Sequence, residues 1–148
     1  MTLFRGWIDV ATRSVVQSGT YGKPDTSYFM PTIGSEGDAT VIVHYVSGPE
    51  TYVRMDVAGR AADHTPNELE DSIVVEEGKS KYDALPGSVE RWGDYNGFSI
   101  DPATGRFWTV SQYSPDIDIP IEADERDPYF TRIAEVYFDE DGGPGRGT

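Results

Sequence analysis

The chain has 148 residues, no cysteine, and 26 acidic against 12 basic side chains, which gives a formal net charge of −14. This length is that of one ordinary domain with a buried core, and the lack of cysteine excludes disulfides and thiolate chemistry. The acid excess argues against nucleic acid and anionic membranes as partners. No apolar run has the length and flanks of a signal peptide or a membrane span, so we expect neither.

The balance of turn-forming and aromatic residues favours an all-β fold. The chain contains 16 glycines, 10 prolines and 9 tyrosines, as expected of strands joined by tight turns. Taken in order, Leu3–Val10 and Ser14–Gly19 are β-like segments separated by a short turn. Tyr21–Tyr28 contains glycine, proline and aspartate and is predicted to be a loop.

The next part of the chain predicts three more strands. Met30–Ile33 and Thr40–Val46 flank a polar turn rich in glycine and aspartate, which is the layout of a hairpin. A turn at Ser47–Glu50 leads into Thr51–Val57, where polar and apolar residues alternate with period two. One face of that strand carries Tyr52, Arg54 and Asp56, and the other carries Val53, Met55 and Val57.

The second half alternates long polar loops with strands. We expect loops at 59–70, 78–90 and 114–128, and a tight turn at 101–106. Strands are expected at Asp71–Glu76, Phe98–Ile100, Phe107–Tyr113 and Tyr129–Phe138. Residues 1–138 are therefore predicted to form one domain, and the glycine-rich residues 139–148 a disordered tail.

A hairpin unit recurs along the chain. Ser14–Gly19 and Ser72–Gly78 lie about 58 residues apart, and each is followed by a polar loop with tyrosine and then by a hairpin. The strands group as two, then four, then three. Antiparallel units of four strands in sequence are typical of a β-propeller, and we expect a partial ring of about two blades plus partial strands. A β-sandwich of nine strands is the alternative.

Four segments together carry a resemblance to a known superfamily. Arg91–Tyr95, Ser99–Pro102, Phe107–Trp108 and Tyr129–Ile133 resemble the C-terminal blades of large secreted bacterial β-propeller proteins of the sialidase-like superfamily. Ser99–Trp108 looks like a stretched Asp-box, the Ser-x-Asp-x-Gly-x-Thr-Trp hairpin of that superfamily, with two extra residues before its glycine. The resemblance implies an extracellular or periplasmic protein. It also implies a ring of six or more blades, so that other blades or further copies of the chain would cover the open strand edges.

The loop 91–95 is the first candidate for a ligand site. The resemblance implies that this loop lies where neighbouring blades meet near the central axis. We therefore expect Arg91, Trp92, Asp94 and Tyr95 to contact a glycan or a protein ligand. In the alternative interpretation, Asp94 caps a turn with Arg91 as its partner, while Trp92 and Tyr95 pack between blades.

A sialidase-type glycoside hydrolase is the competing interpretation. Such an enzyme needs a tyrosine nucleophile activated by a carboxylate, an aspartate acid–base and an arginine cluster. Residues of these types are Tyr95, Asp94, Glu90, Arg91, Arg54 and Arg132. The enzyme hypothesis predicts that arginine, tyrosine and carboxylate converge within hydrogen-bond reach in one pocket.

Metal binding has one candidate segment. The two histidines, His44 and His64, are not spaced as a metal pair, and we expect His44 to be a packed strand residue. Carboxylate oxygens suit calcium, and the acidic segment after residue 115 contains six acidic residues within 12 positions. Its candidate calcium ligands are Asp116, Asp118, Glu122 and Asp124. A solvated acidic loop without metal is the alternative, and no other cofactor is expected.

The sequence thus predicts a non-catalytic structural or recognition segment of a larger secreted β-propeller protein. Its partners would be a glycan or protein ligand, together with the blades or chain copies that cover its strand edges. A sialidase-type enzyme fragment and a self-associating structural protein are the alternatives. The last of these predicts apolar terminal strands that pair between copies.

Overall fold

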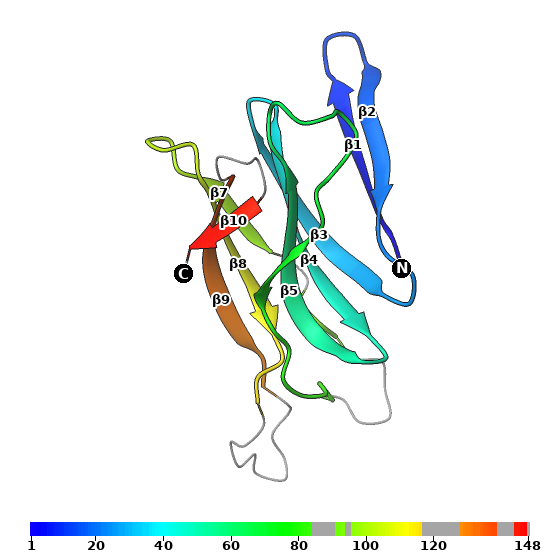
Figure 1. Ribbon diagram of the computed structural model, residues 1–148, viewed down its shortest axis with the longest axis vertical. Helices are drawn as coiled ribbons and strands as arrows, with labels where there is room; N and C mark the ends of the chain where they lie inside the picture. The colour runs from blue at the N-terminus through cyan, green and yellow to red at the C-terminus, as the bar shows by residue number, and fades with distance from the viewer. Residues whose placement is uncertain (84–90, 94–95, 117–127, 139–143, 148) are drawn as a thin grey trace.

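The structure is a computed structural model that describes residues 1–83, 91–93, 96–116, 128–138 and 144–147. Within these ranges the fold is all-β and antiparallel, as predicted (Figure 1). The strands are β1 (Leu3–Asp9), β2 (Ser14–Tyr21), β3 (Ser27–Glu36), β4 (Ala39–Gly48), β5 (Thr51–Arg60), β6 (Ile73–Glu76), β7 (Gly97–Ile100), β8 (Phe107–Tyr113), β9 (Phe130–Phe138) and β10 (Pro144–Gly147).

Each sheet is a meander of strands that are consecutive in the chain. β1 and β2 form a two-stranded hairpin, β3 to β6 form a four-stranded sheet in sequence order, and β7 to β10 form a second four-stranded sheet in sequence order. The grouping expected from the sequence, two, four and then three strands, differs only by the addition of β10. No strand among the described residues crosses from one sheet to another.

The C-terminal segment departs from the expectation of a disordered tail. Pro144–Gly147 pairs antiparallel with β9, where Pro144 lies opposite Phe138 and Gly147 lies opposite Glu135. Without β10, the outer edge of β9 would present unpaired backbone groups. β10 pairs with these backbone groups. Its composition of proline, glycine and arginine does not predict a strand. Residues 139–143 and 148 lie outside the described part.

The sheet β3–β6, which we call the central sheet, has two differently covered faces. We call these faces inner and outer. The register places Val41 and Val43 of β4 on the inner face, whereas Thr40, Ile42 and His44 point to the outer face. On β5 the inner face carries Met55 and Val57, as the period-two pattern predicts. From Asp56 to Arg60 every residue of β5 is buried, because protein packs against both faces there.

The inner face packs against the β7–β10 sheet. The shared core contains Val41, Val43, Met55, Val57, Val75, Phe107, Ala134 and Val136. Two glycines allow this close approach. A Cβ on Gly34 of β3 would overlap the ring of Phe98, and a Cβ on Gly59 of β5 would lie 2.9 Å from Cζ of Phe138. The two four-stranded sheets are therefore held face to face by large aromatic side chains over bare backbone.

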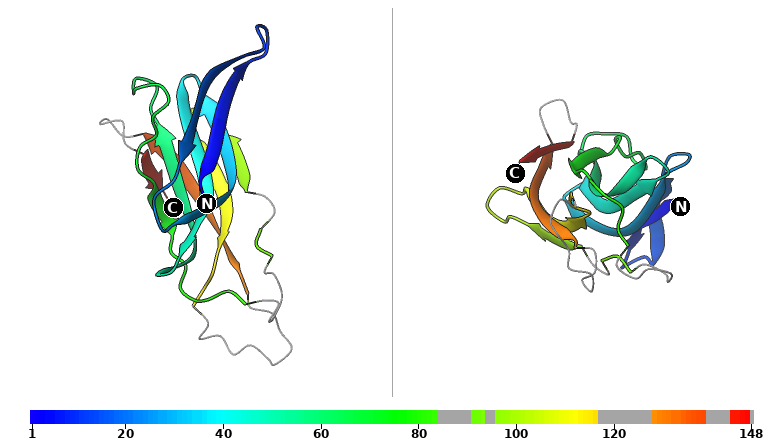
Figure 2. Two further views of the ribbon diagram at one scale, coloured as in Figure 1. Left: turned by 90° about the vertical axis from the view of Figure 1, so that its right-hand side faces the viewer. Right: turned by 90° about the horizontal axis from the view of Figure 1, so that it is seen from below.

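The hairpin β1–β2 covers part of the outer face. Leu3 of β1 is buried with Tyr28, Ile42 and Val46 in a second, smaller core, and burial of such a leucine stabilises by about 1.5–3 kcal/mol. The hairpin, the central sheet and the β7–β10 sheet thus follow one another in space in chain order (Figure 2, right). The tip of the hairpin projects past the other two sheets (Figure 2, left).

Candidate functional site

The first candidate loop is fixed by packing around Trp92. Trp92 is only 8% exposed. Its indole lies edge-on to Tyr45 at 5.7 Å and to Tyr82 at 4.7 Å between ring centroids. A buried ring clamped by two tyrosines offers no face to a ligand, so Trp92 takes the packing role. Arg91 is exposed, and Asp94 and Tyr95 lie outside the described residues.

The residue after this loop ties it to the central sheet. Asn96 donates from Nδ2 to the carbonyl of Met30 at 2.6 Å, its carbonyl accepts from Oγ1 of Thr32 at 3.4 Å, and its Oδ1 accepts from Ser111. Met30 has φ 46°, a left-handed conformation that is rare for a methionine, and it lies in a bulge of β3. Asn96 therefore joins β3 to β8 at an irregular point of the sheet.

The predicted calcium segment is described only at its start. Asp116 is exposed, and Asp118, Glu122 and Asp124 lie outside the described residues. Within the part of the chain that the structure describes, no three histidine, aspartate or glutamate side chains gather closely enough to hold a metal ion. Calcium binding stays a prediction.

A buried polar cluster lies on the outer face of the central sheet. Arg54 holds Asp56 through two hydrogen bonds of 2.9 and 3.2 Å and also reaches Glu77. Asp56 accepts a further bond from Oγ of Ser72 at 3.2 Å. Burial raises the pKa of Asp56, and the neighbouring Arg54 guanidinium counteracts part of that rise. This pair binds its own partners, so the carboxylate is not free for a substrate.

The aromatic side of the cluster is equally enclosed. His44 is fully buried against Tyr28 and Tyr21, with ring centroids 5.3 and 5.7 Å away. Neither of its ring nitrogens has a hydrogen-bond partner, and burial lowers the pKa of His44 to about 4. The hydroxyl of Tyr21 accepts from the backbone N–H of Ser72 at 2.7 Å. Arg54 and Asp56 thus bond to each other, Tyr21 bonds to the backbone of Ser72, and His44 is a packed strand residue, as predicted.

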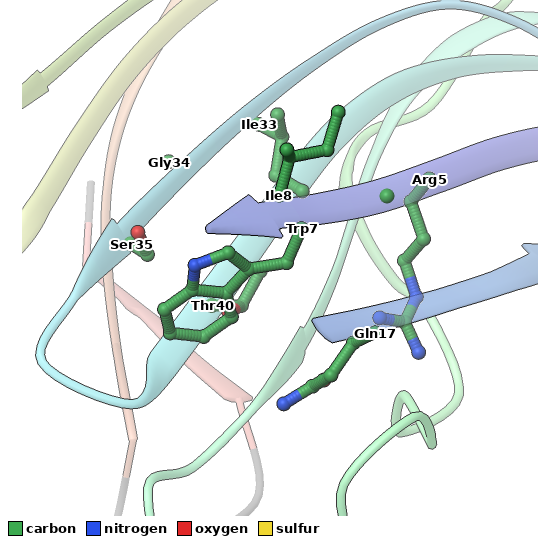
Figure 3. Close-up of a pocket in the computed structure, with 9 residues that line it drawn as sticks. Arg5, Trp7, Ile8, Gln17, Ile33, Gly34, Ser35 and Thr40 are labelled. Atoms are coloured by element: carbon green, nitrogen blue, oxygen red, sulfur yellow. The ribbon is translucent and has the colours of Figure 1, made fainter. Parts of the chain in front are cut away.

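A groove that the sequence did not reveal lies between the hairpin and the central sheet (Figure 3). Its volume is about 210 Å³. Trp7 and Arg5 extend into it from β1, while Ile33, Gly34 and Ser35 line the wall formed by β3. Gln17 and Thr40 complete the lining together with Gly6 and Ile8. The groove offers an indole, a guanidinium, an amide and two hydroxyl groups beside apolar surface, so its lining can donate several hydrogen bonds.

The electrostatics of this groove differ from those of the whole chain. Arg5 forms no ion pair or hydrogen bond with any side chain that the structure describes, and its guanidinium lies across the backbone of Gly19. Burial and the positive charge of Arg60 both lower the pKa of Arg5. Arg60 is itself buried and donates to the carbonyls of Asp38, Ala61 and His64. Among the described residues neither arginine forms an ion pair, in a chain of net charge −14.

The hairpin also exposes an unusual number of apolar side chains. Val10 is 87% exposed, Phe4 73%, Val15 63%, Ile8 60% and Val16 54%. Single exposed apolar residues are common, whereas these five side chains are gathered on one hairpin. The sequence predicts strands for these residues, and the self-associating alternative predicts apolar terminal strands.

No family model matches the chain, and neither a curated protein nor a solved structure matches it. Among the residues that the structure describes, no helix is long and apolar enough to cross a bilayer. The groove and the exposed hairpin must therefore be interpreted from their own chemistry.

Proposed function

We propose that this chain is a non-catalytic structural and recognition module of a larger secreted assembly. In this proposal its sheets are consecutive blades of a β-propeller-like arrangement. The supporting observation is topological: the chain finishes each sheet before it begins the next, and neighbouring sheets pack face to face. Such four-stranded meanders are the repeating unit of propellers, whereas Greek-key sandwiches exchange strands between their two sheets.

The hairpin β1–β2 carries the functional part of the proposal. It contains two strands where each following unit contains four, and its apolar side chains lie in solvent. Exposure of apolar surface to water is unfavourable in free energy, and burial against another unit would remove this cost. The hairpin is accordingly the surface on which a neighbouring unit of the assembly packs.

The interpretation of the buried polar cluster agrees with a non-catalytic role. Arg54 bonds to Asp56, and Tyr21 bonds to Ser72, inside the protein, and the described residues that line the groove include no carboxylate for acid–base chemistry. A secreted location and a glycan or protein ligand belong to the same proposal and rest on the sequence resemblance.

The proposal is tested by the mass in solution, measured by light scattering over a dilution series at moderate salt. We expect association that depends on protein concentration and is driven by the exposed hairpin. The double variant Val10→Lys, Val16→Lys places two charges on that surface without touching the groove, and it should be monomeric throughout. Phe130 and Tyr129 are exposed on the opposite sheet, so Tyr129→Lys, Phe130→Lys is the matched control and should associate as the wild type does. A wild type that stays monomeric at every concentration would contradict the proposal.

A further inference from the structure

The groove under the hairpin continues along β1. A second hollow of about 150 Å³ shares Arg5, Gly6 and Ile33 with the first, and adds Pro31 and Ile42. Together the two hollows follow β1 from Leu3 to Ile8. Six residues of an extended strand span roughly 20 Å at a rise of about 3.3 Å per residue. The part of β1 that lines the two hollows therefore has the length of a six-residue extended segment.

One edge of the hairpin is open at this groove and the other is occupied. On β2, the backbone N–H of Ser18 donates to Oδ1 of Asn67 at 3.1 Å, and the N–H of Asn67 reaches Oε1 of Gln17. Asn67 adopts φ 68°, which turns the loop after β5 onto this edge. On the far side, β1 pairs with no strand other than β2 among the residues that the structure describes, so its outer backbone groups have no strand partner there. A strand that adds to the hairpin would add at β1.

The charge of the groove selects the occupant. Among the described residues, no aspartate or glutamate lines either hollow, although the chain has 26 acidic residues. Among the described residues Arg5 has no hydrogen-bond or ion-pair partner, and Arg60 donates to backbone carbonyls rather than to a carboxylate. A carboxylate placed at Arg5 would supply the missing counter-charge and accept charge-assisted hydrogen bonds.

The geometry points to a binding site for an extended, acidic peptide segment of a partner protein, which adds as a strand along β1 and sets a carboxylate against Arg5. Its apolar side chains would lie on Ile33 and Ile8, and Trp7 would cover one end. This inference rests on the proposed recognition role and specifies the chemistry of the partner.

The test uses capped octapeptides of alternating valine and threonine, each carrying one aspartate, with the aspartate moved through all eight positions. A parallel set carries asparagine instead. Binding is measured by fluorescence anisotropy on the Val10→Lys, Val16→Lys variant, which keeps the groove but removes the associating surface. We expect at least one aspartate peptide to bind about tenfold more tightly than its asparagine counterpart. That preference should disappear when Arg5→Gln is added to this variant. It should persist when Lys23→Gln is added instead, because Lys23 is an exposed positive charge that pairs with Asp71 and does not line either hollow.

A second readout locates the peptide without any change at Arg5. Amide hydrogen exchange of β1 should slow when the aspartate peptide is added, while exchange in β8 should not change. Equal binding of aspartate and asparagine peptides, or binding by none of them, overturns the inference. Binding of glucuronate, with no binding of any peptide, would identify an acidic sugar as the ligand and would also overturn the inference. These outcomes are independent of the association measured by light scattering, so either claim can fail alone.

Discussion

The ring of Phe98 in β7 occupies the space into which a side chain at Gly34 in β3 would project. The two residues lie 64 positions apart in the chain, one in each four-stranded sheet. Their contact depends on the absence of a Cβ at Gly34. Phe98 in turn packs on Phe107, with ring centroids 5.7 Å apart. The face-to-face packing of the two sheets is thus sensitive to one methyl group at Gly34.

Replacement of Gly34 by alanine should destabilise the protein by about 1–3 kcal/mol, the usual cost of overpacking. Chemical denaturation measures this change. Gly6→Ala is the matched control, because the nearest atoms to its Cβ would lie 3.9 Å away, and it should change stability by less than about 1 kcal/mol. Equal effects of the two substitutions would contradict the described packing of Phe98.

Trp92→Ala should cost about 3–5 kcal/mol, as truncation of a buried aromatic does. The reason is the loss of its contacts with Tyr45 and Tyr82. Trp108 is 42% exposed, so Trp108→Ala should cost clearly less in the same thermal unfolding experiment. If Trp92→Ala leaves stability unchanged, Trp92 is not a packing residue and its assignment to a ligand site regains support.

Asp56→Ala should destabilise by about 3 kcal/mol, because it leaves the Arg54 guanidinium partly buried without its closest partner. Glu77 lies at the exposed end of the same network, with 58% of its side chain in solvent. Glu77→Ala should therefore change the free energy of unfolding by less than about 1 kcal/mol. Urea unfolding of the two variants at pH 7 compares the buried and exposed partners directly, and a larger loss in Glu77→Ala would be the contrary result.

The stability of the protein should fall as the pH is lowered from 6.5 to 4 because of His44. Burial lowers the pKa of this histidine from 6.5 to about 4, so within this window the unfolded chain binds a proton that the folded chain excludes. The full effect is on the order of 3 kcal/mol. Asp56 acts in the opposite direction, because its pKa is raised and protonation of the folded state above pH 3.8 offsets part of the loss.

The variant His44→Phe keeps an aromatic ring against Tyr21 and Tyr28 but cannot take up a proton. Its free energy of unfolding should change less between pH 6.5 and 4 than that of the wild type. The measurement is urea denaturation at several pH values. Parallel pH profiles for the two proteins would mean that His44 is not the group responsible.

Much of the strand architecture could be predicted from the sequence. Period-two alternation and turn chemistry gave nine of the ten strands within the described residues, including the tight turn at Asp101. There Asp101 accepts from the N–H of Ala103 at 2.9 Å and from Oγ1 of Thr104 at 2.7 Å, and Gly105 has φ 69°. Local signals of this kind survive because turns are made by neighbouring residues.

The candidate site was less predictable, since it depends on contacts between distant segments. Nothing in the sequence near Arg5 indicates that Arg60 lies close enough to affect its pKa. The alternating pattern of Thr51–Val57 places Asp56 on the polar face of its strand, yet Asp56 is buried. Trp92 looked like a ligand contact because aromatic loops often bind, but Tyr45 and Tyr82 enclose it. β10 was missed because glycine and proline carry no strand signal, and only the open edge of β9 accounts for it.

The most direct test of the assembly role of the hairpin is amide hydrogen exchange in β1 and β2, measured on the wild type at low and at high protein concentration. The account predicts that these amides exchange more slowly at high concentration, that β4 and β5 show no such change, and that Val10→Lys, Val16→Lys abolishes the difference. Exchange in β1 and β2 that is independent of concentration, in a chain that is monomeric throughout, would contradict the account.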